Sequence, residues 1–126
     1  MKTLLTIFTL VFSVMFSSTS FAEWTKVDES VSGNTFYVDF ERVRKHDGYV
    51  YFWSLSDYLK PKLGDLSTRI YQQGDCKLFR YKHLSASFHK EPMGGGAGDP
   101  FTPPDKWNYP SPDSVNEGIL KLVCSR

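Results

Sequence analysis

Residues 49–58 read YVYFWSLSDY, and this stretch decides the fold. Because successive side chains of a strand point to opposite faces of a sheet, the stretch divides into two sets. One set consists of Tyr49, Tyr51, Trp53 and Leu55, and the other of Val50, Phe52, Ser54 and Ser56. The first half is apolar on both faces, which is typical of a central strand with something packed on each side. We therefore predict that this strand lies in the middle of a sheet.

Segments on both sides of it also have strand periodicity. In residues 35–40 every second side chain is apolar, which predicts a half-buried strand. Residues 24–27 are a shorter strand candidate. The pair Asp47-Gly48 predicts a turn immediately before the central strand, and the Pro and Gly of residues 60–64 predict its end.

Residues 67–90 predict two further strands or one long bent strand. Residues 84–88 alternate apolar and polar side chains, but the same alternation carried backwards would place Arg80 and Lys82 among the apolar set. Because one extra residue inverts the alternation, we predict a bulge or bend within residues 79–83.

Residues 92–112 have the Gly- and Pro-rich composition of a connecting loop, and a helix follows them. Ser114 and Glu117 form an S-x-x-E capping box at the start of residues 115–124, whose apolar side chains recur at helical spacing. Gly118 weakens this helix by roughly 1 kcal/mol relative to alanine. The predicted fold is an α+β domain, a meander of strands closed by one C-terminal helix.

Residues 1–22 have the features of a removable signal peptide. A short basic start precedes an apolar run over residues 4–16, and Ser20 and Ala22 stand at positions −3 and −1 of a signal-peptidase site. About 20 predominantly apolar residues are needed to span a bilayer, whereas this run has 13. We expect cleavage rather than an uncleaved anchor, and one exported domain over residues 23–126, either periplasmic or secreted to the cell surface.

Signal removal leaves a formally neutral chain that is rich in aromatic residues. Lys2 is the only charge lost, so 15 − 1 = 14 basic residues remain against 14 acidic ones. Four of the 20 aromatic residues leave with the signal, so 16 remain in 126 − 22 = 104 residues. Disordered chains are poor in aromatics and nucleic-acid-binding domains carry a basic excess, so we expect neither disorder nor a nucleic-acid partner.

Cys76 and Cys124 are the only two cysteines, and they lie 48 residues apart. That spacing is too long for a CxxC redox pair, and in an exported chain a structural disulfide is the default. A free reactive thiol and an intermolecular link are the alternatives. A bond between them would tie the C-terminal helix to the strand region and contribute about 4 kcal/mol in the chain-entropy model.

No motif in the chain predicts catalysis, a metal or a cofactor. The histidines His46, His83 and His89 have no third ligand at matching spacing, so we interpret them as surface residues rather than a zinc site. Carboxylate pairs such as Asp39 with Glu41, or Asp47 with Asp57, occur in any globular protein and carry little weight. Residues 94–98 are glycine-rich but lack the lysine and hydroxyl of a phosphate-binding loop, and we interpret them as a flexible connector.

The aromatic content leaves two interpretations open. Tyr58, Tyr71, Tyr81 and Tyr109 fall on polar stretches, which indicates a binding surface if they are exposed. Alternatively, most of the aromatic residues pack in a small core.

Several features occur together in an order and spacing that carry a family resemblance. They are Trp24, Tyr37-Val38-Asp39, the segment Trp53–Tyr58, Asp75-Cys76-Lys77, Arg80, Trp107 and the segment Ser114–Cys124. Over nearly the whole of residues 23–126, the chain resembles the surface-adhesin protein E-like domain family of Gram-negative bacteria. The resemblance implies a curved antiparallel sheet of about six strands, with the C-terminal helix on its concave face and fastened by a Cys76–Cys124 disulfide.

The resemblance also implies a non-enzymatic binding module, with a homodimer and host extracellular-matrix or serum proteins as its partners. The adhesin that names the family resembles a lipoprotein with a cysteine directly after its cleavage site, whereas Glu23-Trp24 follow the site here. We therefore expect no stable membrane anchor after signal cleavage. The alternative hypothesis is a soluble periplasmic structural or envelope-associated protein with bacterial partners.

Overall fold

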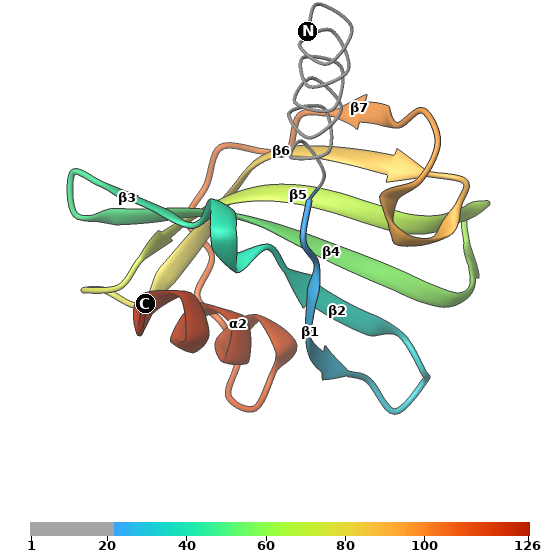
Figure 1. Ribbon diagram of the computed structural model, residues 1–126. Helices are drawn as coiled ribbons and strands as arrows, with labels where there is room; N and C mark the ends of the chain where they lie inside the picture. Colours follow the sequence, from blue (N-terminus) through green and yellow to red (C-terminus); the bar gives the residue numbers. More distant parts are fainter. Residues whose placement is uncertain (1–21) are drawn as a thin grey trace, which may run out of the picture.

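A computed structural model describes residues 22–126, so the expected signal peptide lies outside the described residues except for Ala22. Within that range, seven strands form one antiparallel sheet, and a single α-helix lies beneath it (Figure 1). The strands are β1 Thr25–Glu29, β2 Thr35–Val38, β3 Arg44–His46, β4 Tyr49–Lys62, β5 Asp65–Asp75, β6 Arg80–His89 and β7 Asp99–Phe101. The other elements are the 3-10 turns η1 Phe40–Arg42 and η2 Pro92–Gly94, and the helix α2 Val115–Cys124.

The strand order is β1-β2-β4-β5-β6-β7, and β3 pairs with the beginning of β4 beyond the end of β2. β4 is therefore a central strand, as its two apolar faces predict. It continues beyond Tyr58 to Lys62, into residues 60–64, whose Pro and Gly predict its end. Pro61 is tolerated there because the pairing of β2 with β4 ends at Asp57, so this part of β4 has an open edge that needs no donor.

Two hairpins of the sheet are closed by two-residue turns. The predicted turn at Asp47-Gly48 has φ of 51° and 83°, and Leu63-Gly64 between β4 and β5 has φ of 52° and 85°. Two positive φ angles define the type I′ turn, whose twist matches that of paired strands and which favours Asn-Gly or Asp-Gly. Asp47-Gly48 fits that preference, whereas Leu63 places a bulky side chain at a position that costs roughly 1–2 kcal/mol.

The bulge in β6 lies one residue beyond the predicted window of residues 79–83. Tyr71 pairs with Ser85 and Gln72 pairs with His83, so Leu84 is the extra residue. Cross-strand partners share a face, and the bulge therefore turns the first half of β6 over. Arg80 and Lys82 consequently lie on the face opposite the helix, and the conflict in the sequence pattern disappears.

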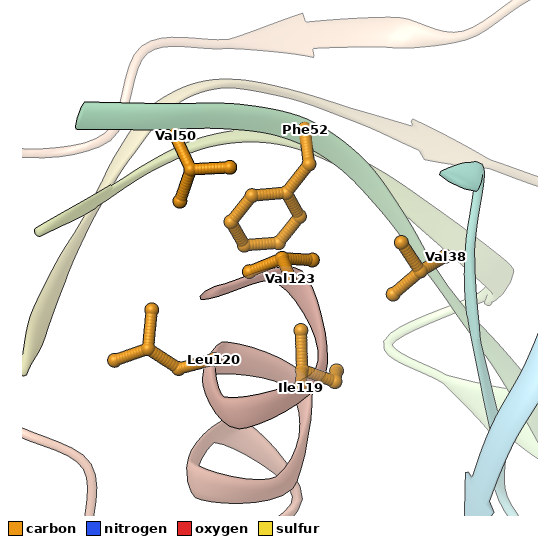
Figure 2. Close-up of a cluster of buried hydrophobic side chains, with 6 residues drawn as sticks. All are labelled: Val38, Val50, Phe52, Ile119, Leu120 and Val123. Carbon is orange, nitrogen blue, oxygen red and sulfur yellow. The ribbon is translucent and has the colours of Figure 1, made fainter. Parts of the chain in front are cut away.

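The hydrophobic core lies between α2 and the concave face of the sheet, where β4 arches over the helix (Figure 2). Its fully buried members are Val38, Val50, Phe52, Ile119, Leu120 and Val123. Burying one such side chain contributes about 1.5–3 kcal/mol, so this small set carries much of the stability. The other face of β4 is covered at Leu55, against which Gly94 of η2 lies.

The N-cap at Ser114 is confirmed, and the return bond of Glu117 reaches Asp113, one residue before the N-cap. Ser114 Oγ accepts a hydrogen bond from the Glu117 backbone N–H at 3.1 Å, and Glu117 Oε1 accepts one from the Asp113 N–H at 3.2 Å. The first bond satisfies a donor that the helix itself leaves free, and the second holds the chain that enters the helix. The helix therefore begins where the sequence predicts.

A disulfide joins Cys76, directly after β5, to Cys124, the last residue of α2. The Cα atoms are 5.7 Å apart, within the range that an unstrained disulfide spans. The bond is intramolecular, which excludes the free thiol and the intermolecular link. It closes a 48-residue separation and fastens the helix to the sheet, as the family resemblance implies.

We expect Cys76→Ser to lower the free energy of unfolding by about 4 kcal/mol, because the unfolded chain regains the entropy of an open loop. Thermal unfolding with and without reductant measures the effect. The double substitution Cys76→Ser with Cys124→Ser serves as the control for a stray thiol and should match the single variant. An unchanged Tm in reductant would contradict this assignment.

A pair of glycine substitutions tests the packing of α2 on the sheet. A Cβ at Gly74 would lie 2.8 Å from Val50 Cγ1 and 2.9 Å from Leu120 Cδ1, so Gly74→Ala should destabilise by about 1–3 kcal/mol through overpacking. A Cβ at Gly118 would meet nothing within 4 Å. Gly118→Ala should therefore stabilise the protein by up to roughly 1 kcal/mol. Denaturant titration of both variants measures the two opposite shifts, and shifts of the same sign would refute the packing described here.

Candidate binding surface

The convex face of the sheet carries a row of partly exposed aromatic rings. They are Tyr49, Tyr51 and Trp53 from β4, Tyr71 from β5, and Trp107 from the segment after β7; we call this set the aromatic face. It has two parts. Trp107 stacks on Tyr49 with ring centroids 5.7 Å apart, and Tyr71 contacts Trp53 at 4.9 Å and Tyr51 at 6.3 Å.

Strand register explains this clustering. Trp53 and Tyr71 are directly opposed on β4 and β5, and Tyr51 is opposed to Gln73, one position along the same face. Directly opposed and diagonal side chains on one face are within contact distance of each other. The alternating aromatic residues of β4 therefore meet Tyr71 on the neighbouring strand.

Three cationic side chains lie over these rings. The Arg69 guanidinium carbon is 5.1 Å from the centroid of Trp53, and Arg80 and Lys82 lie 4.2 Å and 4.5 Å from that of Trp107. Each such contact is worth about 0.5–1 kcal/mol at an exposed site. They hold the tryptophans in place and give the aromatic face a cationic margin.

Acidic partners neutralise two of the three cations. Asp75 binds Arg80 Nε at 2.9 Å, and Asp105 lies 2.9 Å from Lys82 Nζ. Within the described residues, Arg69 belongs to no ion pair, so no carboxylate neutralises its charge. Arg69 is thus the cation of this face that is best placed to contact a ligand.

The buried side chain of Asp75 holds both Arg80, beside the aromatic face, and the turn that carries the disulfide. Its side chain also accepts hydrogen bonds from the backbone N–H groups of Lys77 and Leu78, at 3.2 Å and 3.1 Å. Burial opposes ionisation, but the bonds from Arg80 and the two N–H groups, with the Arg80 charge, outweigh it and hold the pKa of Asp75 below its ordinary value. The carboxylate thereby fixes the turn that presents Cys76.

The concave face of the sheet holds a hollow beside α2. It is a cavity of about 330 Å³ between the helix and the sheet, lined by both apolar and polar side chains. In it, Gln72 donates to Ser54 Oγ at 2.7 Å, so these buried groups satisfy each other. Burial lowers the pKa of His83, which keeps that imidazole neutral at pH 7.

The structure separates the three histidines considered above. His46 is exposed beside Asp47, and His83 lies on the concave face. His89 is buried at 3% exposure and bonds Ser87 Oγ and the Gly95 carbonyl. The interpretation of all three as surface residues is therefore wrong for His89, and within residues 22–126 no three potential ligands gather around a metal position.

The glycine-rich segment 94–98 is held against the sheet rather than free. Ser67 Oγ accepts a hydrogen bond from the Gly94 N–H at 2.8 Å, Asp57 Oδ1 accepts one from the Met93 N–H at 2.7 Å, and His89 bonds the segment at Gly95. The expectation of a flexible connector is wrong, because strand side chains form hydrogen bonds with the backbone of three consecutive residues, Met93, Gly94 and Gly95. Asp57 consequently has a structural role.

Two of the four tyrosines on polar stretches are engaged within the fold. Tyr58 bonds Thr68 at 2.7 Å, and Tyr81 bonds Asn116 of α2 at 2.9 Å. Tyr71 belongs to the aromatic face and Tyr109 is exposed. The aromatic residues are therefore divided between contacts within the fold and the aromatic face, and binding by that face stays a prediction. Tyr49, Tyr51 and Trp53 could have been found from the alternation of residues 49–53 alone, whereas no local pattern assigns Trp107 to this face.

Comparisons with known proteins agree with this fold. The family model described as surface-adhesin protein E matches residues 24–125. A crystal form of Haemophilus influenzae protein E is similar, with TM-score 0.60 and 19% identity over 81% of this chain and 87% of that chain. Protein E from non-typeable Haemophilus influenzae has TM-score 0.58 and 17% identity over 86% of this chain and 79% of that chain. No curated protein matches in sequence.

The Asp75–Arg80 pair predicts a defined pH dependence. Because folding lowers the pKa of Asp75, the stability that this carboxylate contributes is present above its ordinary pKa of 3.8 and is lost as the pH falls below that value. We expect Asp75→Asn to lower Tm by several degrees at pH 7, with the difference from the unmodified protein shrinking towards pH 3. Asp105→Asn, at an exposed ion pair, is the control and should change Tm little at any pH. A constant difference across the range would exclude the charge as the cause.

Proposed function

We propose that this chain, which belongs to the surface-adhesin protein E family, is a non-enzymatic protein-binding module that makes its contacts through the aromatic face. The observation that carries the proposal is the row of partly exposed Tyr and Trp rings with Arg69 beside them. Tyr, Trp and Arg are the side chains that dominate binding energy at protein interfaces. A sheet face that presents them together on rigid strands needs little ordering when a partner binds.

The chemistry of the described residues supports a role without catalysis. The titratable groups that a reaction would need are engaged in holding the fold: His89 in the glycine-rich segment, Asp75 in its turn, and Asp39 beside Arg42. Family and fold suggest the same. We therefore assign no catalytic residue and no cofactor.

For the partner, we favour host extracellular-matrix or serum proteins, with residues 1–22 directing export and residues 23–126 forming the exported domain. The alternative is a soluble periplasmic protein whose aromatic face binds a bacterial envelope protein. A second copy of this chain is a further partner for the same face, which light scattering of the purified protein measures directly.

The location of the protein in the cell distinguishes adhesion to host proteins from the periplasmic alternative. Protease applied to intact cells should degrade the protein if it is displayed at the surface. Protection until the outer membrane is permeabilised would support the periplasmic alternative. Secreted protein in the medium would also support adhesion, because it would reach host proteins.

We expect Trp53→Ala and Tyr71→Ala each to weaken binding about 30-fold, since truncating an interface hot spot costs about 2 kcal/mol or more. Binding is measured against immobilised matrix proteins, serum proteins and bacterial envelope proteins in parallel. Leu122→Ala, on the exposed side of α2, is the matched control and should bind normally. If both aromatic variants keep full affinity for a ligand that the unmodified protein binds, the aromatic face is not the contact surface.

A further inference from the structure

One end of the sheet presents aliphatic side chains to solvent. Val31 at the tip of the β1–β2 hairpin and Leu63 at the tip of the β4–β5 hairpin are fully exposed, and Leu59 beside them is 65% exposed. Monomeric soluble proteins seldom expose clustered aliphatic groups without a binding partner for them. We call these three residues, with Lys60 and Lys62, the hairpin end.

The two hairpins are held side by side. The Leu59 N–H donates to Asn34 Oδ1 at 3.0 Å, and Gly33 lies against the Leu59 side chain. Figure 1 shows both hairpins at the same end of the sheet, away from the turn between β5 and β6. Val31 and Leu63 therefore lie in turns at the same end of the sheet, on two hairpins that this contact joins.

Leu63 is unfavourable for the fold in two ways. Its φ of 52° is strained for a bulky side chain, and its exposure recovers no hydrophobic energy in the isolated protein. Phe79 has the same φ, but its ring packs against the core. Asp47 occupies the equivalent position of the other type I′ turn with a side chain that the turn favours. A strained backbone at Leu63 that no contact within the protein offsets indicates that this side chain contacts another molecule.

The charges at the hairpin end point to an anionic surface. Within residues 22–126, neither Lys60 nor Lys62 belongs to an ion pair. The carboxylates near these tips are engaged. Asp65 pairs with Lys90, Asp57 accepts the Met93 N–H, and in β1 Glu29 pairs with Lys26 while Asp28 accepts the Glu29 N–H. Lys60 and Lys62 thus flank the exposed aliphatic groups without a carboxylate partner, and Lys62 Nζ lies 5.8 Å from the centroid of the Tyr58 ring.

We propose that the hairpin end docks on an anionic phospholipid bilayer, with Leu63 and Val31 entering the acyl boundary and Lys60 and Lys62 contacting headgroup phosphates. Aliphatic groups at protruding tips beside flexible lysines suit such an interface. A protein pocket is less favoured because interface hot spots are Trp, Tyr and Arg, whereas Leu and Val are under-represented.

This docking leaves the aromatic face accessible. The nearest members of that face are Trp53 on β4 and Tyr71 on β5, ten and eight residues from Leu63. At about 3.3 Å per residue they lie on the order of 25–35 Å from it along the strands. The sheet would stand on the membrane by its hairpin end, with both faces open to other molecules. Membrane docking and protein binding can therefore be tested separately.

The test is co-sedimentation of the exported, processed protein with vesicles of phosphatidylglycerol and phosphatidylcholine, and with vesicles of phosphatidylcholine alone. We expect binding to the anionic vesicles and much less to the neutral ones. Leu63→Asn should reduce the anionic partition coefficient about tenfold while keeping or raising Tm, because Asn-Gly suits the turn. Lys60→Glu with Lys62→Glu should remove the preference for anionic vesicles.

Leu78→Asn is the matched control. Leu78 is 54% exposed in the turn at the opposite end of the sheet, so its substitution should leave vesicle binding unchanged. Equal losses for Leu63→Asn and Leu78→Asn, or no sedimentation with anionic vesicles, would overturn the proposal. It would also be overturned if Leu63→Asn abolished binding to a protein but not to vesicles.

Discussion

The Cys76–Cys124 disulfide is the constraint on which the packing of sheet against helix depends. It holds α2 at the end of β5, and α2 supplies half of the six fully buried apolar side chains of the core. A helix of ten residues is marginal by itself in water. The disulfide and the close packing of α2 on the sheet at Gly74 therefore allow a small core to hold the fold together. Asp75 orients the turn that carries Cys76, one end of the disulfide.

β4 divides the molecule into two functional sides. Its alternate residues Val50 and Phe52 close the core with the helix, which leaves the opposite set free to form the aromatic face on the convex side. The bulge at Leu84 then aligns β6 with this division, so that Arg80 and Lys82 lie over Trp107 instead of facing the core. One strand thus positions both the stabilising and the proposed binding surface, and its far end carries the hairpin that we propose for membrane docking.

Much of this was predictable from local pattern, and the failures share one cause. The central strand, the turn at Asp47-Gly48, the N-cap at Ser114 and the family were all readable from neighbouring residues or their spacing. The continuation of β4 through Pro61 was not, because it depends on where the adjacent strand ends. The burial of His89 and the anchoring of the glycine-rich segment were missed for the same reason: their partners are distant in the sequence.

By itself, the sequence determined the antiparallel α+β fold, the division of β4 into two faces and the pair of cysteines available for cross-linking. Those features depend on periodicity and residue type, which act within a few positions. Only the tertiary structure decided that Trp107 joins Tyr49, that Arg69 lies over Trp53, and that Val31 and Leu63 project from one end. Such arrangements depend on strand register and on long-range packing, and a shift of one residue would place each side chain on the other face.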